Sequence, residues 1–290
     1  MNVAIVGMGR MGSAMARRLH EQGFELAVYN RTRAKAESTA EHTGSRVAES
    51  AADAVSRADV VISILADDQA LREAYLGEAG IASGLREGTV VLEMSTIDPR
   101  TLDDLRPAVT AAGAVLLDAP VSGSVGMVEA GTLMVMIGGD EQALDKARPV
   151  LDKLATKVYH LGASGAGSTM KLAVNGLVHA INQALSEALV LAERSGVPPE
   201  LAYEVFANSA AASPFVAYKR AAFLDPDAAP VAFSLDLVAK DLDLILGLAE
   251  RSGARMPQGE ANLAWATRAV AMGLGSSDMS ALAVALRSSE

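Results

Sequence analysis

The sequence predicts an α/β amino-terminal domain with a doubly wound parallel sheet, followed by an all-α domain. Two observations carry this prediction. Up to about residue 160, short runs rich in Val and Ile alternate with helical stretches, as expected for parallel strands joined by crossover helices. Beyond a glycine-rich stretch at 162–167 the strand pattern ends, and the chain has a helical pattern to residue 290. We therefore predict two domains, 1–161 and 162–290.

Each expected element follows from local pattern. Segments with the length and β-branched content of strands occur at 3–6, 25–29, 60–65, 89–93, 114–119, 133–137 and 157–160. Helical patterns bounded by Gly, Pro or polar residues lie between them, at 11–22, 33–42, 99–111 and 141–154.

The helical domain is expected to begin with a long helix at 164–195, about 47 Å in length at 1.5 Å per residue. A helix of this length outspans a small domain, so we expect it to run between the domains or into a second subunit. Its apolar part also carries Asn175, His179 and Asn182, which a lipid environment would not tolerate without partners. We therefore predict a buried helix of a water-soluble protein, with no membrane contact.

Composition excludes several classes of function. The chain has 35 acidic and 25 basic residues and a net charge of -10, which disfavours nucleic acid as a partner. It has no cysteine, so thiol nucleophiles, disulfides and thiolate metal sites are excluded. The four histidines lack the spacing of metal ligands, and no metal is predicted. The amino terminus shows no secretion signal, so a cytoplasmic location is expected.

A glycine motif of the form G-x-G-x-x-G follows the first expected strand and opens the first expected helix. It consists of Gly7, Met8, Gly9, Arg10, Met11 and Gly12. The first glycine permits a tight turn, the second lets the backbone approach a pyrophosphate, and the third lets helix and strand pack closely. The free N–H groups of the helix then face the phosphates. The motif in this context predicts a Rossmann dinucleotide-binding domain.

The residues after the second expected strand predict which dinucleotide binds. Asn30, Arg31 and Thr32 directly follow that strand, Lys35 lies one turn later, and no acidic residue occurs from 26 to 36. A carboxylate would favour the ribose hydroxyl of NAD, whereas a 2′-phosphate needs cations and donors. We predict NADP in preference to NAD. A solvated helix start is the competing interpretation of Arg31 and Lys35.

Three further segments indicate which reaction the protein catalyses. The segments 118–123 (DAPVSG), 131–139 (GTLMVMIGG) and 165–175 (GAGSTMKLAVN) closely resemble motifs of the β-hydroxyacid dehydrogenase family, which includes 3-hydroxyisobutyrate dehydrogenase, tartronate semialdehyde reductase and glyoxylate/succinic semialdehyde reductase. The resemblance extends over essentially the whole chain, including 240–241 and 278–282. It implies reversible, NADPH-dependent reduction of the carbonyl of a small aldehyde or keto acid to a hydroxy acid. We also expect a homodimer or homotetramer formed through the helical domain.

The resemblance implies a role for each matching residue. Lys171 resembles the general acid that protonates the carbonyl oxygen, which requires a pKa well below about 10.4. Asn175, four residues later on the same helix face, is expected to hold the substrate. Ser122 and Gly123 resemble the segment that receives the substrate carboxylate, although Ser124 stands where the family commonly has a glycine.

The resemblance also implies further cofactor contacts. The Leu65–Ala66 backbone and Thr96 are expected to contact the nicotinamide half, at strand ends where open α/β sheets bind ligands. Helix capping is the competing role for Thr96. Lys240 is expected to reach the cofactor from the helical domain with Asp241 fixing it, and a surface charge pair is the competing interpretation.

Two other functions are consistent with the same architecture. An imine reductase shares the Asn-Arg-Thr motif but typically lacks a lysine at the position of Lys171. A non-catalytic NADP-binding module, as in nucleosome-associated members of the family, lacks that lysine as well. Lys171 and the acidic charge therefore favour the dehydrogenase.

Overall fold

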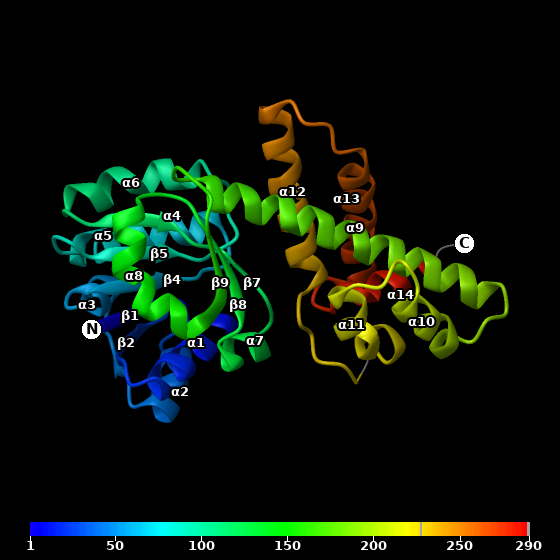
Figure 1. The fold of residues 1–290 in the computed structure, drawn as a ribbon, viewed down its shortest axis with the longest axis horizontal. Helices are drawn as coiled ribbons and strands as arrows, with labels where there is room; N and C mark the ends of the chain where they lie inside the picture. The colour runs from blue at the N-terminus through cyan, green and yellow to red at the C-terminus, as the bar shows by residue number, and fades with distance from the viewer. Residues whose placement is uncertain (227, 289–290) are drawn as a thin grey trace. The chain divides into compact units, whose positions relative to one another are not determined.

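The computed structural model describes residues 1–226 and 228–288, and the chain forms two compact units, Met1–Lys171 and Leu172–Glu290 (Figure 1). The division falls inside the long helix α9, which spans Ala166–Arg194. The expected helix at 164–195 is therefore present, two residues shorter at its start and one at its end.

The amino-terminal unit is built on a six-stranded parallel sheet. Its order is β3-β2-β1-β4-β5-β6, with strands β1 (Asn2–Val6), β2 (Glu25–Tyr29), β3 (Arg46–Val47), β4 (Val60–Ser63), β5 (Val90–Glu93) and β6 (Val115–Asp118). The chain winds outward from β1 to β3 and then returns to the other side of β1. The direction of winding therefore reverses between β1 and β4, which is where folds of this kind bind dinucleotides.

Helices cover both faces of this sheet (Figure 1). One face packs against α1 (Arg10–Glu21), α2 (Arg33–Thr43), α7 (Val125–Ala130) and α8 (Glu141–Leu154). The other packs against α3 (Ala51–Val55), α4 (Asp68–Leu76), α5 (Ile81–Gly84) and α6 (Thr101–Ala111). Strands buried on both sides must be apolar throughout, which is why the central strands consist almost entirely of Val, Ile and Leu.

A second sheet of three strands lies in the same unit. It contains β7 (Val121–Ser122), β8 (Leu133–Ile137) and β9 (Ala155–His160), with β7 and β8 antiparallel. Two of the expected strands thus lie outside the six-stranded sheet. Ser122, which is expected to receive the substrate carboxylate, pairs in β7 with Met134. The strands β3 and β7 escaped prediction because two residues cannot show an alternating pattern.

The carboxy-terminal unit is helical. It continues α9 and adds α10 (Pro199–Asn208), α11 (Pro214–Leu224), α12 (Leu235–Ser252), α13 (Pro257–Ala269) and α14 (Leu282–Arg287), with short π and 3₁₀ turns at Val270–Leu274 and Met279–Ala281. A proline opens three of these helices, at a position where its missing N–H costs nothing. Leu172, Leu189, Tyr203 and Leu242 lie in its core. The predicted fold class is confirmed.

Of the helices in the described parts of the chain, none combines the length and apolarity that crossing a membrane requires. The polar residues that argued against a lipid environment for α9, Asn175, His179 and Asn182, are all buried within the carboxy-terminal unit.

Candidate cofactor and active site

The amino-terminal unit gathers the predicted cofactor residues at one edge of its sheet. Neighbouring parallel strands end at the same edge, so the segments that follow β1, β2, β4 and β5 come together there. These segments hold the glycine motif, Asn30 to Thr32, Leu65 with Ala66, and Thr96. The carboxyl edge of the sheet, around the point between β1 and β4 where the direction of winding reverses, is therefore the candidate dinucleotide site.

The glycine motif has the shape that a pyrophosphate site needs. Gly7 has a φ of 107°, and a Cβ there would lie 2.1 Å from the Ile64 carbonyl oxygen. A Cβ on Gly12 would lie 1.9 Å from the Gly7 carbonyl oxygen. A Cβ on Gly9 would meet nothing within 4 Å, and α1 begins just after it without a side-chain cap. Gly7 and Gly12 thus allow close packing, whereas Gly9 leaves open space before a helix N-terminus, which fits a bound pyrophosphate.

Asn30 connects this motif to the start of α2. Its Oδ1 accepts a 3.0 Å hydrogen bond from the Met8 N–H, and its Nδ2 donates to the Thr32 carbonyl oxygen at 3.0 Å. Thr32 precedes α2 as its exposed N-cap residue, with no side-chain capping bond. The amide of Asn30 therefore has partners within the protein at both ends, which favours a role in shaping the binding loop.

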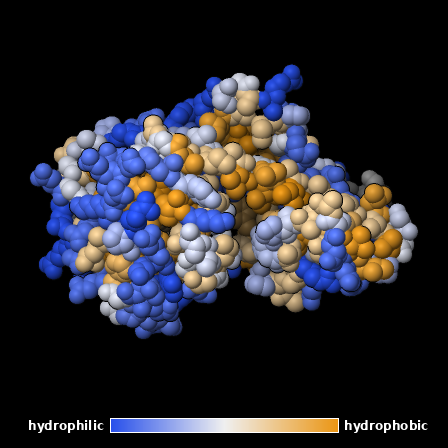
Figure 2. Space-filling view, viewed as in Figure 1, coloured by the Kyte–Doolittle hydropathy of each residue, from blue (hydrophilic) through white to orange (hydrophobic). Residues whose placement is uncertain are grey.

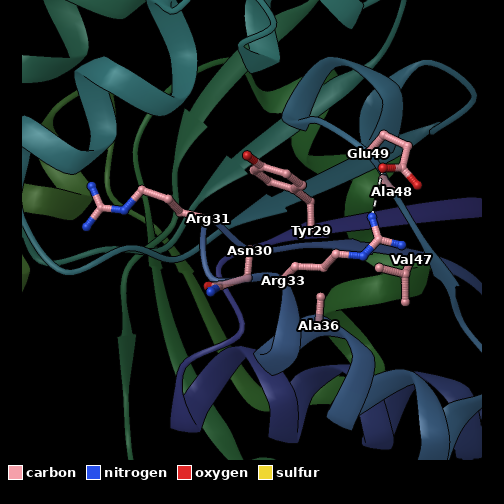
Figure 3. A pocket seen from close by; sticks show the side chains of 8 residues that line it. All are labelled: Tyr29, Asn30, Arg31, Arg33, Ala36, Val47, Ala48 and Glu49. Carbon is pink, nitrogen blue, oxygen red and sulfur yellow. Dashed lines mark hydrogen bonds and ion pairs between the residues drawn. The ribbon is translucent and has the colours of Figure 1, made fainter.

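A small pocket of about 100 Å³ opens beside β2. Eight residues line it: Tyr29, Asn30, Arg31, Arg33, Ala36, Val47, Ala48 and Glu49 (Figure 3). Arg33 donates to Glu49 Oε2 at 2.8 Å and to Glu37 Oε1 at 2.7 Å. Sequence reasoning passed over Arg33, although its place two residues after Arg31 was a usable signal. Lys35 is exposed on α2 and does not line this pocket.

Arg31 points away from Arg33 (Figure 3) and lies 3.4 Å from Glu73 on α4. Its side chain is 85% exposed. The sequence has no carboxylate near Arg31 along the chain, but folding brings Glu73 to Arg31 and Glu49 to Arg33. The absence of nearby acidic residues, on which the NADP prediction partly depended, therefore holds only along the chain and does not hold in space.

The segments after β4 and β5 are joined by a hydrogen bond. The Leu65 N–H donates to Ser95 Oγ at 2.7 Å, and Ser95 is buried next to half-buried Thr96. The N-cap residue of helix α6 is Arg100, which makes no capping bond with its side chain. Ala66 is exposed at the same edge.

Asp118, at the end of β6, holds the start of α9. Its Oδ1 accepts a 2.8 Å hydrogen bond from the Gly165 N–H, and its Oδ2 accepts a 2.9 Å bond from the Ser168 N–H. A carboxylate at a helix N-terminus is favoured by the free N–H groups and the helix dipole. Lys171 follows in the next turn and is half-buried. Asp118 thus anchors the helix of the predicted proton donor to the sheet. In the sequence, Asp118 was noted only as the first residue of the 118–123 motif, and this role was not predicted.

The segment predicted to receive the substrate carboxylate, Ser122 and Gly123, starts four residues after Asp118. Ser122 is half-buried in β7, and Gly123 is exposed directly after it. Ser124, where the family commonly has glycine, is the N-cap residue of α7 and makes no capping bond with its side chain.

The carboxy-terminal unit places the remaining predicted residues around Asp241. Asn175 Nδ2 donates to Asp241 Oδ2 at 2.6 Å, and Lys240 Nζ lies 2.9 Å from Asp241 Oδ1. His179, one turn beyond Asn175, has its Nε2 3.9 Å from Asp241 Oδ2. Burial acts to raise the pKa of Asp241, but His179 and Lys240 outweigh it and hold that pKa below its ordinary value. Sequence reasoning placed Asp241 beside Lys240 but missed its bond to Asn175.

Two known protein families match the chain, one in each part. Residues 2–162 match the family described as the NAD-binding domain of 6-phosphogluconate dehydrogenase. Residues 165–286 match the family described as NAD-binding of NADP-dependent 3-hydroxyisobutyrate dehydrogenase. Both parts of the chain therefore belong to families named for nicotinamide-dinucleotide binding.

Similar proteins match over nearly the full chain. Glyoxylate/succinic semialdehyde reductase 1 of Arabidopsis thaliana is 32% identical over 99% of both chains. An NAD-dependent L-serine dehydrogenase of Pseudomonas aeruginosa is 34% identical over 89% of this chain and 88% of its own. The structure of 3-hydroxyisobutyrate dehydrogenase from Mycobacterium tuberculosis, solved with L-serine, is 31% identical, covers 99% of both chains and superposes with a TM-score of 0.86. By these matches and its own motifs, the chain belongs to the β-hydroxyacid dehydrogenase family.

Proposed function

We propose that the protein is an NADPH-dependent oxidoreductase that reversibly reduces the carbonyl of a small, carboxylate-bearing aldehyde or keto acid to a hydroxy acid. One observation carries the proposal. The open glycine motif follows β1, and Asp118, which anchors the start of the Lys171 helix, ends β6, so both lie at the carboxyl edge of the six-stranded sheet within one compact unit.

The roles of the chain's own groups follow from their chemistry. When bound, the reduced nicotinamide supplies the hydride for the carbonyl carbon. Lys171 donates a proton from its ammonium group to the carbonyl oxygen, which leaves a neutral amine and a hydroxyl product. Asn175 is held by Asp241 and offers an oriented amide to the substrate. Backbone N–H groups near Gly123 and the Ser122 hydroxyl are suited to a carboxylate.

The test of this mechanism separates catalysis from cofactor binding. Lys171→Met is expected to lower kcat at least about a hundredfold, which is the lower range of general acid catalysis, while leaving the NADPH Kd nearly unchanged. Lys157→Met, at an exposed lysine on β9, is the matched control and should retain full activity. If Lys171→Met keeps more than a few per cent of wild-type turnover, Lys171 is not the proton donor.

NADPH as the preferred coenzyme is supported by Arg31, Arg33 and Lys35 beside the end of β2. Glu49 and Glu73 offset part of this positive charge. The family that matches residues 165–286 is named for an NADP-dependent enzyme, whereas the Pseudomonas aeruginosa relative is named as NAD-dependent. The ratio of kcat/KM for NADPH to that for NADH decides the matter, and a ratio at or below one would overturn the preference.

The substrate class is supported by the named activities of the relatives, which involve glyoxylate, succinic semialdehyde and L-serine. Each of these molecules is small and carries a carboxylate. An NADPH-oxidation screen over glyoxylate, succinic semialdehyde, tartronate semialdehyde and methylmalonate semialdehyde is expected to give at least one efficient substrate. Cyclic imines belong in the same screen, because turnover of imines alone would make the protein an imine reductase.

A homodimer or homotetramer is supported by apolar residues left exposed on α9. Leu177 is 65% exposed and Leu191 is 70% exposed. Ala184 lies between them at spacings of seven residues, so the three share one face of the helix. Figure 2 shows apolar side chains gathered along α9. Light scattering is expected to give a molar mass in solution of at least twice the 29.9 kDa chain mass. The substitution Leu177→Glu is expected to lower that measured mass by weakening the association.

A further inference from the structure

Glu93 is a buried acid to which the proposed reaction assigns no role. It ends β5 and is 1% exposed. Its Oε2 accepts a 3.0 Å hydrogen bond from the Tyr75 hydroxyl, and its Oε1 accepts a 2.8 Å bond from the Ser95 N–H. In the described parts of the chain no cation forms a salt bridge with it. A buried carboxylate without a cation is costly, so Glu93 is a candidate for a role beyond packing.

The hydrogen bonds from Glu93 lead to the candidate cofactor site. Ser95 receives the Leu65 N–H at its Oγ, 2.7 Å away, and is itself buried. Because Ser95 is bound to Glu93 through its own amide, the carboxylate fixes the serine and the serine fixes the Leu65 amide. Leu65 and Ala66 follow β4, next to the strand that carries the glycine motif. The hydrogen bonds from Glu93 through Ser95 to Leu65 therefore connect the interior to the edge of the sheet.

We propose that Glu93 is a positioning residue, which acts through Ser95 to hold the Leu65–Ala66 segment in the conformation that binds the nicotinamide cofactor. The proposal rests on the proposed function of this edge as a dinucleotide site. Glu93 touches neither cofactor nor substrate in this scheme. The ionised carboxylate only accepts hydrogen bonds from its neighbours. The protonated form must donate from one oxygen, which disturbs the hydrogen bonds from Glu93 through Ser95 to Leu65.

The surroundings of Glu93 make this arrangement sensitive to pH. Burial raises the pKa of Glu93 to about 7, against the hydrogen bonds from Ser95 and Tyr75, which lower it. The ionisable groups beside it are Tyr75 from α4 and Asp118, its register partner on β6, while β4 presents the Ser63 hydroxyl. Asp118 already accepts hydrogen bonds from the N–H groups of Gly165 and Ser168 at the start of α9. Cofactor affinity is therefore expected to weaken as the pH falls through the pKa of Glu93.

The test measures binding of NADPH and of NADH by fluorescence titration between about pH 6 and pH 8, on either side of the pKa of Glu93. Wild type is expected to bind each coenzyme about fivefold more weakly at the acidic end, the equivalent of one net hydrogen bond. Glu93→Gln cannot ionise, so its affinity should be weak and change less than about twofold over the same range. Including NADH removes the titration of the NADPH 2′-phosphate, whose pKa also lies near about 6.

Further variants keep the test decisive. Ser95→Ala should weaken binding at every pH, and Ser95→Thr, which keeps the hydroxyl, should restore it. Glu87→Gln, at an exposed glutamate of the same unit, should behave as wild type. The same pH dependence in Glu93→Gln as in wild type, or full affinity in Ser95→Ala, overturns the positioning role while leaving the proposed function intact. Failure of wild type to bind either coenzyme at any pH overturns the proposed function itself.

Discussion

Asn175 Nδ2 donates a 2.6 Å hydrogen bond to Asp241 Oδ2, across 66 residues of sequence. Both side chains are buried. The other carboxylate oxygen of Asp241 pairs with Lys240. One buried acid thus joins a residue predicted to hold the substrate to a residue predicted to reach the cofactor.

Removal of this junction is expected to impair substrate binding. Asp241→Ala leaves the buried Asn175 amide without its acceptor, at a cost of about 1–3 kcal/mol, so kcat/KM for the substrate should fall about tenfold or more. Asp243→Ala, at an exposed acid on the same helix, is the control. Steady-state kinetics of both variants check the prediction, and equal kcat/KM values would refute it.

Glu73 is expected to limit NADPH affinity by pairing with Arg31. The pair is exposed, so it contributes less than about 1 kcal/mol. Glu73→Gln frees Arg31 for a 2′-phosphate, and the NADPH Kd should fall about two- to fivefold. The NADH Kd should not change, since NADH lacks the phosphate. Glu78→Gln, at another exposed acid, serves as control. An equal gain for both coenzymes would show that Arg31 does not discriminate between them.

Replacement of Gly9 is expected to weaken cofactor binding, whereas replacement of Gly12 is expected to lower thermal stability. A Cβ on Gly9 meets no protein atom within 4 Å, so Gly9→Ala should keep the wild-type Tm. Its methyl group enters the space assigned to the pyrophosphate, and NADPH affinity should drop about tenfold, or 1.4 kcal/mol. Gly12→Ala places a Cβ 1.9 Å from a backbone oxygen and should lower the Tm itself. Thermal melts without cofactor, followed by titration with NADPH, separate the two effects.

Glu93 is expected to make stability depend on pH. Its pKa of about 7 in the folded protein lies above the ordinary value of 4.5. Between these values the folded state keeps a proton that the unfolded state releases, so the free energy of unfolding falls as the pH rises and levels off above the folded pKa. Glu93→Gln escapes this loss, which is at most on the order of 3 kcal/mol. The Tm difference between variant and wild type should therefore be more positive at about pH 8 than at about pH 5. No change in that difference with pH would contradict the shifted pKa.

Local patterns in the sequence were sufficient to predict the fold class, and they also predict where the cofactor binds. Strand and helix patterns are local, and a parallel sheet with crossover helices follows from their alternation. The spacing of Gly7, Gly9 and Gly12 after the first strand is local as well, and so predicted a Rossmann site. Strands of two residues leave no such pattern, which is why the pairing of Ser122 in β7 was not predicted.

Which charged and polar groups meet depends on the folded arrangement of distant parts of the chain. Glu73 reaches Arg31 across 42 residues of sequence, and Leu65 reaches Ser95 across 30. The bond between Asn175 and Asp241 joins two different helices of the carboxy-terminal unit. Periodicity shows which face of an element is apolar but not which distant side chain will lie opposite it. Electrostatic and hydrogen-bonding energies depend on those distances, so the tuning of the site is a property of the folded chain.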